Sequence, residues 1–222
     1  MNKKNRVITI DGPAGSGKST VAKLVARDLN YLYLDTGALY RAVAYKVSIS
    51  GRTGAKEEEM RDLLASTSIC LKRNHDGLVV LVDNEDVSRK IRTEEIAVLA
   101  STASALPVIR KALLPIQREC AKEESIVAEG RDMGTVVFPQ ADFKFYLHAT
   151  LEERARRRYL ELIEKGLSPD SEEIRASIIL RDKQDTERAA SPLRISDDAQ
   201  VIDTSELTIQ EVLANILAEI RL

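Results

Sequence analysis

Hydrophobic positions along the chain follow two alternating patterns. Short, nearly continuous apolar runs are typical of strands buried inside a parallel sheet, and stretches in which apolar residues recur at helical spacing follow them. Five apolar runs are predicted to be strands: residues 6–10, 31–35, 125–129, 143–149 and 199–204. Because parallel strands are joined by right-handed crossovers that place helices on the sheet, the pattern predicts an α/β fold with a parallel sheet flanked by helices.

The stretches between these runs carry the helical signals. The predicted helices cover residues 21–29, 36–47, 152–166, 171–184 and 207–220. Thr93, which precedes two glutamates, indicates a further helix start, and Pro107 is typical of the first turn of the next helix. Residues 50–59, SGRTGAKEEE, are polar and contain two glycines, so we interpret them as a break between elements.

The period changes between residues 69 and 82. ICLKR and LVVLV flank the turn sequence NHDG, which is the pattern of a β-hairpin. This hairpin does not belong to the strand–helix alternation of the remaining chain. We therefore expect an insert with a small sheet of its own.

The stretch ITIDGPAGSGKST places a glycine-rich turn between the first predicted strand and the first predicted helix. Its spacing, Gly12-x4-Gly17-Lys18-Ser19, is that of a P-loop. Backbone N–H groups of such a turn surround phosphate oxygens, Lys18 reaches the β- and γ-phosphates, and the Ser19 hydroxyl binds Mg²⁺. The predicted ATP-binding residues are Gly12, Pro13, Ala14, Gly15, Ser16, Gly17, Lys18, Ser19 and Thr20.

Composition narrows the class of protein. The chain has 222 residues, 44% hydrophobic and 31% charged, with a formal net charge of −2, as expected for a globular protein. No apolar run reaches the roughly 18 residues of a membrane helix, and no secretory signal is visible. Cys70 and Cys120 stand apart from each other and from histidines, which favours a reducing cytoplasm. We expect a monomer.

The class of P-loop protein follows from what accompanies the loop. The sequence contains neither the Asn-Lys-x-Asp run of GTPases nor the Leu-Ser-Gly-Gly-Gln run of transporter ATPases. A phosphoryl transferase with a small acceptor is left as the leading class. A phosphate acceptor needs no general base, but it needs guanidinium groups to offset charge, and arginines are abundant in loops and at strand ends. Arg154, Arg156, Arg157 and Arg158 are interpreted as one exposed helix face and are given no role.

Five segments carry a resemblance to a known family. ITIDGPAGSGKST, LDTGALYR, AEGRDMGTVVFP, RDKQDTER and SPL, in this order, closely resemble the bacterial cytidylate kinases, which are nucleoside monophosphate kinases. The resemblance extends from Val7 to the final helix. It implies transfer of the γ-phosphate of ATP to CMP or dCMP with Mg²⁺. It also implies a core of residues 1–35, 103–150 and 191–222, a monophosphate-binding domain of residues 36–102, and a lid of residues 151–190.

The same resemblance implies roles for particular residues. Lys18, Arg131 and Arg188 are the expected catalytic residues. Arg41, with Arg131 and Arg188, is expected to hold the acceptor phosphate. The implied CMP-binding set is Thr36, Tyr40, Arg41, Ser101, Arg110, Arg131, Asp132, Arg181, Asp185 and Arg188. Within it, Ser101, Arg110 and Asp132 face the base, Arg181 and Asp185 meet the ribose, and Tyr40 packs against the nucleoside.

The chain departs from some relatives at three positions. Thr36 replaces a serine and keeps the hydroxyl, whereas Glu129 replaces an aspartate and is one carbon longer. Ser19 follows Lys18 where others have glycine, which favours direct Mg²⁺ ligation. If Glu129 orders the Mg²⁺ shell through water, its geometry differs slightly from that of an aspartate.

The chemistry of cytosine supports the base assignment. A carboxylate such as Asp132 accepts a hydrogen bond from N4, while Arg110 and Ser101 donate to N3 and O2. Uracil reverses two of these sites and would leave buried polar groups unpaired. This argues against UMP as the acceptor.

Other functions fit the sequence less well. A kinase of another monophosphate, such as UMP, or of a metabolite hydroxyl is the alternative within the class, and a nucleotide-binding regulator without catalysis is the alternative outside it. A nucleic-acid-binding module is the weakest, because aromatics are only 4% and no basic stripe occurs. His75 and His148 have no catalytic partner in the sequence pattern and are expected to be structural.

Overall fold

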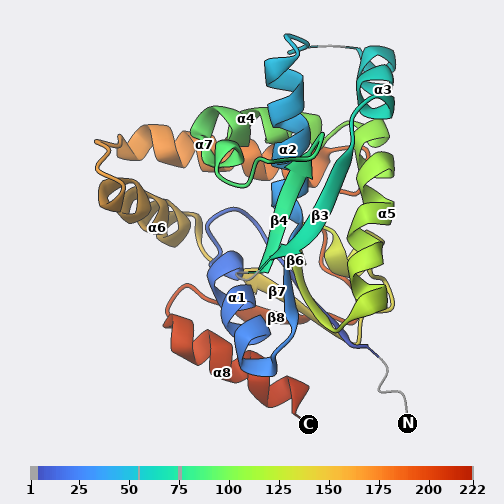
Figure 1. Cartoon of the computed structure of the whole chain (residues 1–222). Coiled ribbons are helices and arrows are strands. Elements are labelled where there is room, and N and C mark those ends of the chain that lie inside the picture. Colours follow the sequence, from blue (N-terminus) through green and yellow to red (C-terminus); the bar gives the residue numbers. More distant parts are fainter. Residues whose placement is uncertain (1–4, 55, 75–76, 222) are drawn as a thin grey trace.

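The protein is described by a computed structural model that covers residues 5–54, 56–74 and 77–221 (Figure 1). Its centre is a five-stranded parallel sheet with the order β2-β6-β1-β7-β8. The strands are β1 (Val7–Asp11), β2 (Leu32–Asp35), β6 (Ile126–Gly130), β7 (Phe143–His148) and β8 (Gln200–Asp203). The predicted parallel sheet is therefore confirmed, and all five strands begin within one or two residues of their expected starts.

Strand register brings the loops that follow β1, β2 and β6 to one edge of this sheet. Asp11 pairs with Gly130, and Asp35 pairs with Glu129, so these three strands end at the same level. The carboxyl ends of parallel strands are where open α/β sheets bind ligands, because the helix N-termini converge there. The P-loop and the residues after β2 and β6 are thus neighbours.

Eight α-helices and two short helical turns are present in the described residues. They are α1 (Lys18–Leu29), α2 (Thr36–Ile49), α3 (Glu57–Ala65), η1 (Lys90–Arg92), α4 (Glu94–Ala103), α5 (Pro107–Glu123), η2 (Met133–Val137), α6 (Leu151–Glu164), α7 (Ser171–Glu187) and α8 (Ile209–Ile220). The side chain of Thr93 accepts a hydrogen bond from the backbone N–H of Ile96, and Pro107 lies in the first turn of α5, as predicted.

The interpretation of residues 50–59 as a break is wrong at its C-terminal end. Glu57, Glu58 and Glu59 form the first turn of α3, where negative side chains interact favourably with the helix dipole. Met60 and Leu63 supply its buried face. The three glutamates look like loop sequence, and the apolar face that identifies the helix lies beyond the stretch.

Two apolar layers cover the main sheet. On one face, Ile8, Ile10 and Val127 pack against buried residues of α1 and α8. On the other face, Leu34 and Ile126 contribute to a cluster that also includes residues of α5 and η2. Alternation along each strand produces this division, because successive side chains of a strand point to opposite faces.

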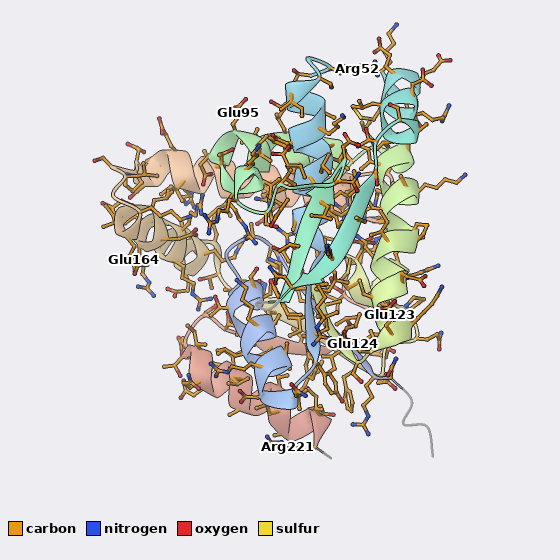
Figure 2. All side chains as sticks on the ribbon, in the orientation of Figure 1. Arg52, Glu95, Glu123, Glu124, Glu164 and Arg221 are labelled. Atoms are coloured by element: carbon orange, nitrogen blue, oxygen red, sulfur yellow. The ribbon has the colours of Figure 1, made fainter. Side chains whose placement is uncertain are left out.

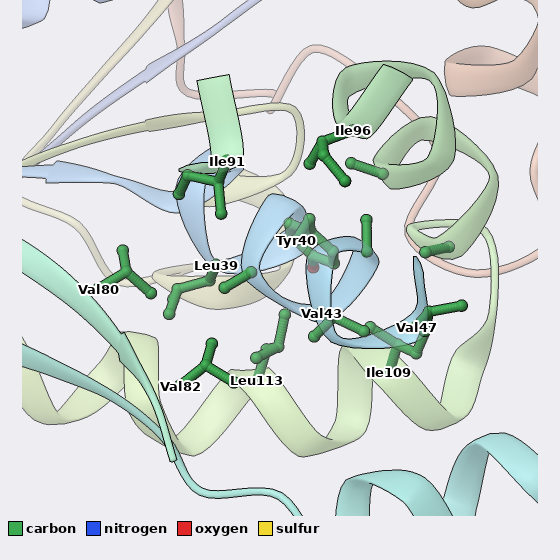
Figure 3. Close-up of a cluster of buried hydrophobic side chains, with 14 of the residues drawn as sticks. Leu39, Tyr40, Val43, Val47, Val80, Val82, Ile91, Ile96, Ile109 and Leu113 are labelled. Carbon is green, nitrogen blue, oxygen red and sulfur yellow. The ribbon is translucent and has the colours of Figure 1, made fainter. Parts of the chain in front are cut away.

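The hairpin insert forms its own antiparallel sheet, as expected. It consists of β3 (Ile69–Asn74), β4 (Gly77–Val82) and the short β5 (Glu85–Asp86), in that order. Residues 75–76 of the predicted turn lie outside the described residues. Figure 3 shows how Val80 and Val82 of this sheet pack with side chains of α2 and α5 in the third apolar cluster.

Helices α6 and α7 are the two helices predicted between residues 152 and 184. They form a pair beside the main sheet, and α7 runs next to α4 (Figure 1). Two side-chain contacts join the pair to α4: Arg158 forms an ion pair with Glu94, and the Ser101 hydroxyl donates to Gln184 Oε1 at 2.9 Å. Both helices of the α6–α7 pair therefore contact α4 through side chains.

Candidate active site

The P-loop lies between the end of β1 and the start of α1. Gly12 has φ +152°, and a Cβ built there would stand 2.3 Å from the Leu147 carbonyl oxygen, so only glycine fits. Gly17 has φ +85° and caps α1 from the left-handed region. The Ser16 hydroxyl is buried and lacks a hydrogen-bond partner within the described part of the chain. The loop thus presents unpaired donors beside a helix N-terminus.

Lys18 is the cation of this loop. Its ammonium donates to the Pro13 carbonyl at 3.0 Å, and only 7% of the residue is exposed. Burial, together with the nearby charge of Arg131, lowers the pKa of Lys18 to about 7. A bound polyphosphate would supply the negative charge that restores the ordinary pKa of this lysine.

Ser19 faces a buried carboxylate across the first turn of α1. Its hydroxyl donates to Glu129 Oε2 at 2.7 Å, while the Tyr33 hydroxyl donates to Glu129 Oε1 at 2.5 Å. Burial and the charge of Glu129 raise the pKa of Tyr33, so its hydroxyl stays protonated and acts as a donor. These hard oxygen atoms at the sheet edge suit a magnesium ion.

A cluster of arginines and carboxylates lies near Lys18, and the charges of Arg131, Arg181 and Asp185 act on that lysine. Arg131 Nε donates to Asp185 Oδ2 at 2.7 Å, and Arg188 Nε donates to the Ser191 carbonyl at 2.8 Å. Arg110 and Asp132 form a buried ion pair. Burial alone would raise the pKa of Asp185, but its interaction with Arg131 outweighs burial and the pKa is lowered. The chain thus brings together residues of α5, of the segment after β6 and of the C-terminal end of α7.

The arginine donors of this cluster exceed the acceptors that the chain offers them. Within the described residues, one guanidinium nitrogen of each of four arginines is buried without a hydrogen-bond partner: Arg41 Nε, Arg110 Nε, Arg181 Nε and Arg188 Nη2. Burial and the charge of Arg131 lower the pKa of Arg181 to about 10. Since unpaired buried donors are costly, this arrangement suits an anionic ligand.

Exposure separates this cluster from ordinary surface charge. Arg52, Glu95 and Glu164 project from the outside of the molecule (Figure 2). By contrast, the side chains of Arg110 and Arg188 are 9% and 4% exposed. Arg110 and Arg188 are therefore enclosed by neighbouring elements and are not part of a solvated face.

Three further residues implied by the resemblance have partners in the protein itself. The Thr36 hydroxyl donates to the Glu129 carbonyl at 2.7 Å, which ties the start of α2 to β6. Tyr40 is buried, and the guanidinium of Arg110 lies 5.2 Å from the centre of its ring. Ser101 contacts Gln184 of α7, as described above.

Asp11 and Asp35 hold other residues of the site in position. Neither carboxylate was assigned a role from the sequence. Asp11 accepts hydrogen bonds from the backbone N–H groups of Met133 and Gly134 at 2.9 and 2.8 Å, which fixes the segment after Asp132. Burial raises the pKa of Asp11 to about 6. Asp35 caps α2 and pairs with Arg41 at 2.8 Å. Asp11 is the last residue of β1, and Asp35 is the last residue of β2. A carboxylate at the carboxyl end of a predicted strand is the sequence feature that could have identified them.

The interpretation of Arg154, Arg156, Arg157 and Arg158 as one exposed face is wrong for the buried Arg154, and Arg157 and Arg158 are only partly exposed. The Arg154 guanidinium is buried, donates to the Ala14 carbonyl of the P-loop at 3.2 Å and pairs with Asp182 of α7 at 2.6 Å. Arg156 does lie on the surface, with 61% of its side chain exposed. Arg154 lies in the first turn after β7, and the P-loop packs against that strand end.

The remaining polar candidates lie elsewhere. His148 is exposed at the end of β7, and His75 lies outside the described residues. The described part of the chain holds no group of three or more His, Cys, Asp or Glu side chains that suits a metal ion. No single described helix has the length and apolar character to cross a bilayer; α4 and α5 pass that test only as a pair, bent by 103°.

Comparison with known proteins agrees with this geometry. The family model for cytidylate kinase matches residues 8–222. Cytidylate kinase from Geobacter sp. (strain M21) is 46% identical over 207 residues, which cover 93% of this chain and 89% of that protein. Cytidylate kinase from Pseudomonas putida is 47% identical over 226 residues, which cover 99% of this chain and 97% of that protein.

A solved structure extends the comparison to the fold. An uncharacterised protein from Eubacterium ventriosum has a TM-score of 0.52 at 14% identity, covering 98% of this chain and 99% of that chain. That likeness concerns the fold alone. The sequence matches go further, because they run through the P-loop and the arginine cluster together, and on them this chain belongs to the cytidylate kinase family.

Proposed function

We propose that the chain transfers the γ-phosphate of ATP to CMP or dCMP, with Mg²⁺, and releases ADP and CDP or dCDP. The observation that carries this proposal is the set of buried guanidinium nitrogens, on Arg41, Arg110, Arg181 and Arg188, that lack a hydrogen-bond partner within the described residues. One end of the site suits a triphosphate, and the other suits a second phosphate anion. A kinase whose acceptor is a phosphate needs this arrangement.

At the donor end, the P-loop backbone and Lys18 hold the phosphates of ATP. Ser19 fits a magnesium ion, because the residue is exposed and the proton of its hydroxyl is donated to Glu129. Magnesium is commonly held by one or two protein oxygens together with substrate phosphates, so a cage of carboxylates is not required. When bound, the ion offsets charge on the β- and γ-phosphates.

At the acceptor end, Arg41, Arg131 and Arg188 hold the phosphate of the monophosphate. Arg41 pairs with Asp35, Arg131 with Asp185 and the Gly130 carbonyl, and Arg188 with Asp185 and the Ser191 carbonyl. Arg41 Nε and Arg188 Nη2 are the buried nitrogens of these three arginines that lack a hydrogen-bond partner within the described residues. The acceptor oxygen is already anionic, so the reaction requires alignment and charge compensation rather than proton removal.

The base is recognised by Asp132 and Arg110, with Ser101 as a further donor. Asp132 offers an acceptor for the cytosine N4 amine, and Arg110 and Ser101 together offer donors for N3 and O2. Tyr40 packs against the nucleoside, and Thr36 lies at the start of α2 beside it. Asp185 and Arg181 contact the ribose from α7.

We propose three moving or separable parts: a core of residues 1–35, 103–150 and 191–222, a monophosphate-binding domain of residues 36–102, and a lid of residues 151–190. Closure of the lid brings Arg181 and Arg188 over the phosphates and excludes water, which suppresses ATP hydrolysis. We further propose that the chain is a cytoplasmic monomer that acts on free nucleotides and on neither nucleic acid nor membranes.

The proposal is tested by a coupled ADP-release assay with ATP and Mg²⁺. CMP, dCMP, UMP, AMP and shikimate are offered in parallel. We expect strong turnover with CMP and dCMP, weak turnover with UMP and none with the others. Preference for UMP or AMP would refute the base-reading roles, and ATP binding without turnover of any acceptor would favour a nucleotide-binding regulator.

A further inference from the structure

Glu129 has both carboxylate oxygens engaged by hydroxyl groups from two other elements. The residue is 5% exposed, one oxygen accepts from Ser19 of α1, and the other accepts from Tyr33 of β2. A buried carboxylate that loses one such donor is left partly unpaired. The orientation of Glu129 therefore depends on Tyr33 as well as on Ser19.

Strand register explains how Tyr33 reaches this carboxylate. Tyr33 pairs with Val127 of the neighbouring strand β6, and Glu129 lies two residues farther along that strand, on the same face. The Tyr33 ring packs against the apolar cluster beneath α1, and the ammonium of Lys23 lies 5.5 Å from its centre. Packing thus anchors the ring while its hydroxyl points to the site edge.

The hydrogen bond to Glu129 determines where the lone pairs of the Ser19 hydroxyl point. A serine hydroxyl has one proton and two lone pairs, so donating the proton to Glu129 leaves the oxygen lone pairs for a cation. Glu129 accepts that proton through Oε2 because Oε1 is occupied by Tyr33. A carboxylate free to turn would not fix the direction of the Ser19 proton.

We propose that Tyr33 is a positioning residue for the divalent-cation site: its hydroxyl holds Glu129 so that Glu129 accepts the proton of Ser19 and the Ser19 lone pairs face the cation. This inference rests on the proposed magnesium role of Ser19. Hydrogen bonds to the groups that orient metal ligands typically change metal affinity about 10- to 100-fold.

The test is Tyr33→Phe, which removes the hydroxyl and keeps the ring. Mn²⁺ replaces Mg²⁺ as the probe, and the signal of free Mn²⁺ in electron paramagnetic resonance gives its affinity for the complex of protein and ADP. We expect an apparent Mn²⁺ affinity about tenfold weaker than that of the unmodified protein. The affinity for ADP without metal should stay unchanged.

Two controls separate positioning from a structural effect. Tyr31→Phe alters a half-buried tyrosine two residues away in the same apolar cluster and should leave the Mn²⁺ affinity unchanged. Ser19→Ala should weaken Mn²⁺ binding, and in that background Tyr33→Phe should add little, because the two act through one carboxylate.

Several results would overturn the inference. If Ser19→Ala weakens Mn²⁺ binding and Tyr33→Phe does not, the magnesium role stands and the role of Tyr33 fails. If neither substitution changes Mn²⁺ affinity, the proposed metal role of Ser19 fails together with this inference. If Tyr33→Phe weakens metal-free ADP binding as much as Mn²⁺ binding, Tyr33 is only structural.

Discussion

The two ends of the site are built in different ways. The P-loop end uses one continuous segment, in which backbone N–H groups and left-handed glycines surround a single buried lysine. The arginine end uses side chains from α2, α5, α7 and the segment after β6, which are paired with carboxylates from other segments. The first end is local in sequence, and the second exists only when distant segments fold together.

This difference has an energetic consequence. At the P-loop end, most donors are backbone groups that no substitution removes, so the loss of Lys18 leaves the cradle in place. At the arginine end, the donors are side chains, so a substitution removes them and weakens the pairing of a neighbouring carboxylate such as Asp132 or Asp185. Substitutions at the arginine end should therefore have the wider range of effects.

Arg188→Ala is expected to have the largest effect. The proposed role of Arg188 is to stabilise charge on the transferring phosphoryl group, so its removal should lower kcat by roughly a thousandfold. Steady-state kinetics with ATP and CMP measures this, and Arg194→Ala, at an exposed arginine, is the matched control. Near-normal turnover of Arg188→Ala would remove Arg188 from the catalytic residues.

Lys18→Ala is expected to come next. Loss of one charged donor at the phosphates should lower kcat by about 10²- to 10³-fold, because the backbone cradle still binds ATP. Its effect on the KM for ATP should be smaller than its effect on kcat. Kinetics at varied ATP concentration separates the two, and an unchanged kcat would contradict the role of Lys18.

Asp132→Asn should change which base is preferred. An asparagine amide can donate to the O4 of uracil, so the ratio of kcat/KM for CMP to that for UMP should fall about a hundredfold. The ratio is measured with both acceptors on the same preparation. Equal losses with CMP and UMP would indicate that Asp132 supports Arg110 without reading the base.

Asp11 directly precedes the P-loop and accepts hydrogen bonds from the segment after Asp132, so it links the two ends of the site. Its raised pKa makes this link testable through the pH dependence of stability. Its pKa in the folded chain is raised to about 6, so its contribution to stability is present at low pH and is lost as pH rises through about 6. Relative to Asp11→Asn, the unmodified protein should lose about 2 kcal/mol between about pH 4.5 and about pH 7. Urea unfolding of both proteins at several pH values measures this change in the free energy of unfolding. The exposed Asp28→Asn is the control. If the difference in free energy of unfolding between the two proteins did not depend on pH, burial would not dominate the pKa of Asp11.

The smallest effect is expected at the contact between α6 and α4. Glu94→Gln removes the exposed ion-pair partner of Arg158, and exposed pairs contribute at most about 1 kcal/mol. The change in kcat should stay within a few-fold and should shrink at high salt. A change of a hundredfold would mean that this contact controls closure.

The sequence was informative where the signal was local. The P-loop, the five strands and the cap at Thr93 follow from neighbouring residues, and the structure confirms the elements that they predict. Helix α3 was missed because its first turn consists of glutamates that resemble a loop. The pairing of Arg154 with Asp182 was missed because it joins two helices and no single segment encodes it.

The residues of the arginine cluster were predicted, but not from their local sequence. Arg110, Arg131 and Arg188 were assigned through the resemblance, since nothing in their own surroundings distinguishes them from surface arginines. Burial and unpaired nitrogens distinguish them in the folded chain. Those properties depend on tertiary packing, which a periodicity of apolar residues does not specify.

A crystal structure of the protein with CMP, ADP and Mg²⁺ tests the central claim most directly. The account predicts that Arg41, Arg131 and Arg188 contact the CMP phosphate and that Asp132 accepts from the cytosine N4 amine. A CMP phosphate bound away from these arginines, or a cytosine that contacts neither Asp132 nor Arg110, would contradict it.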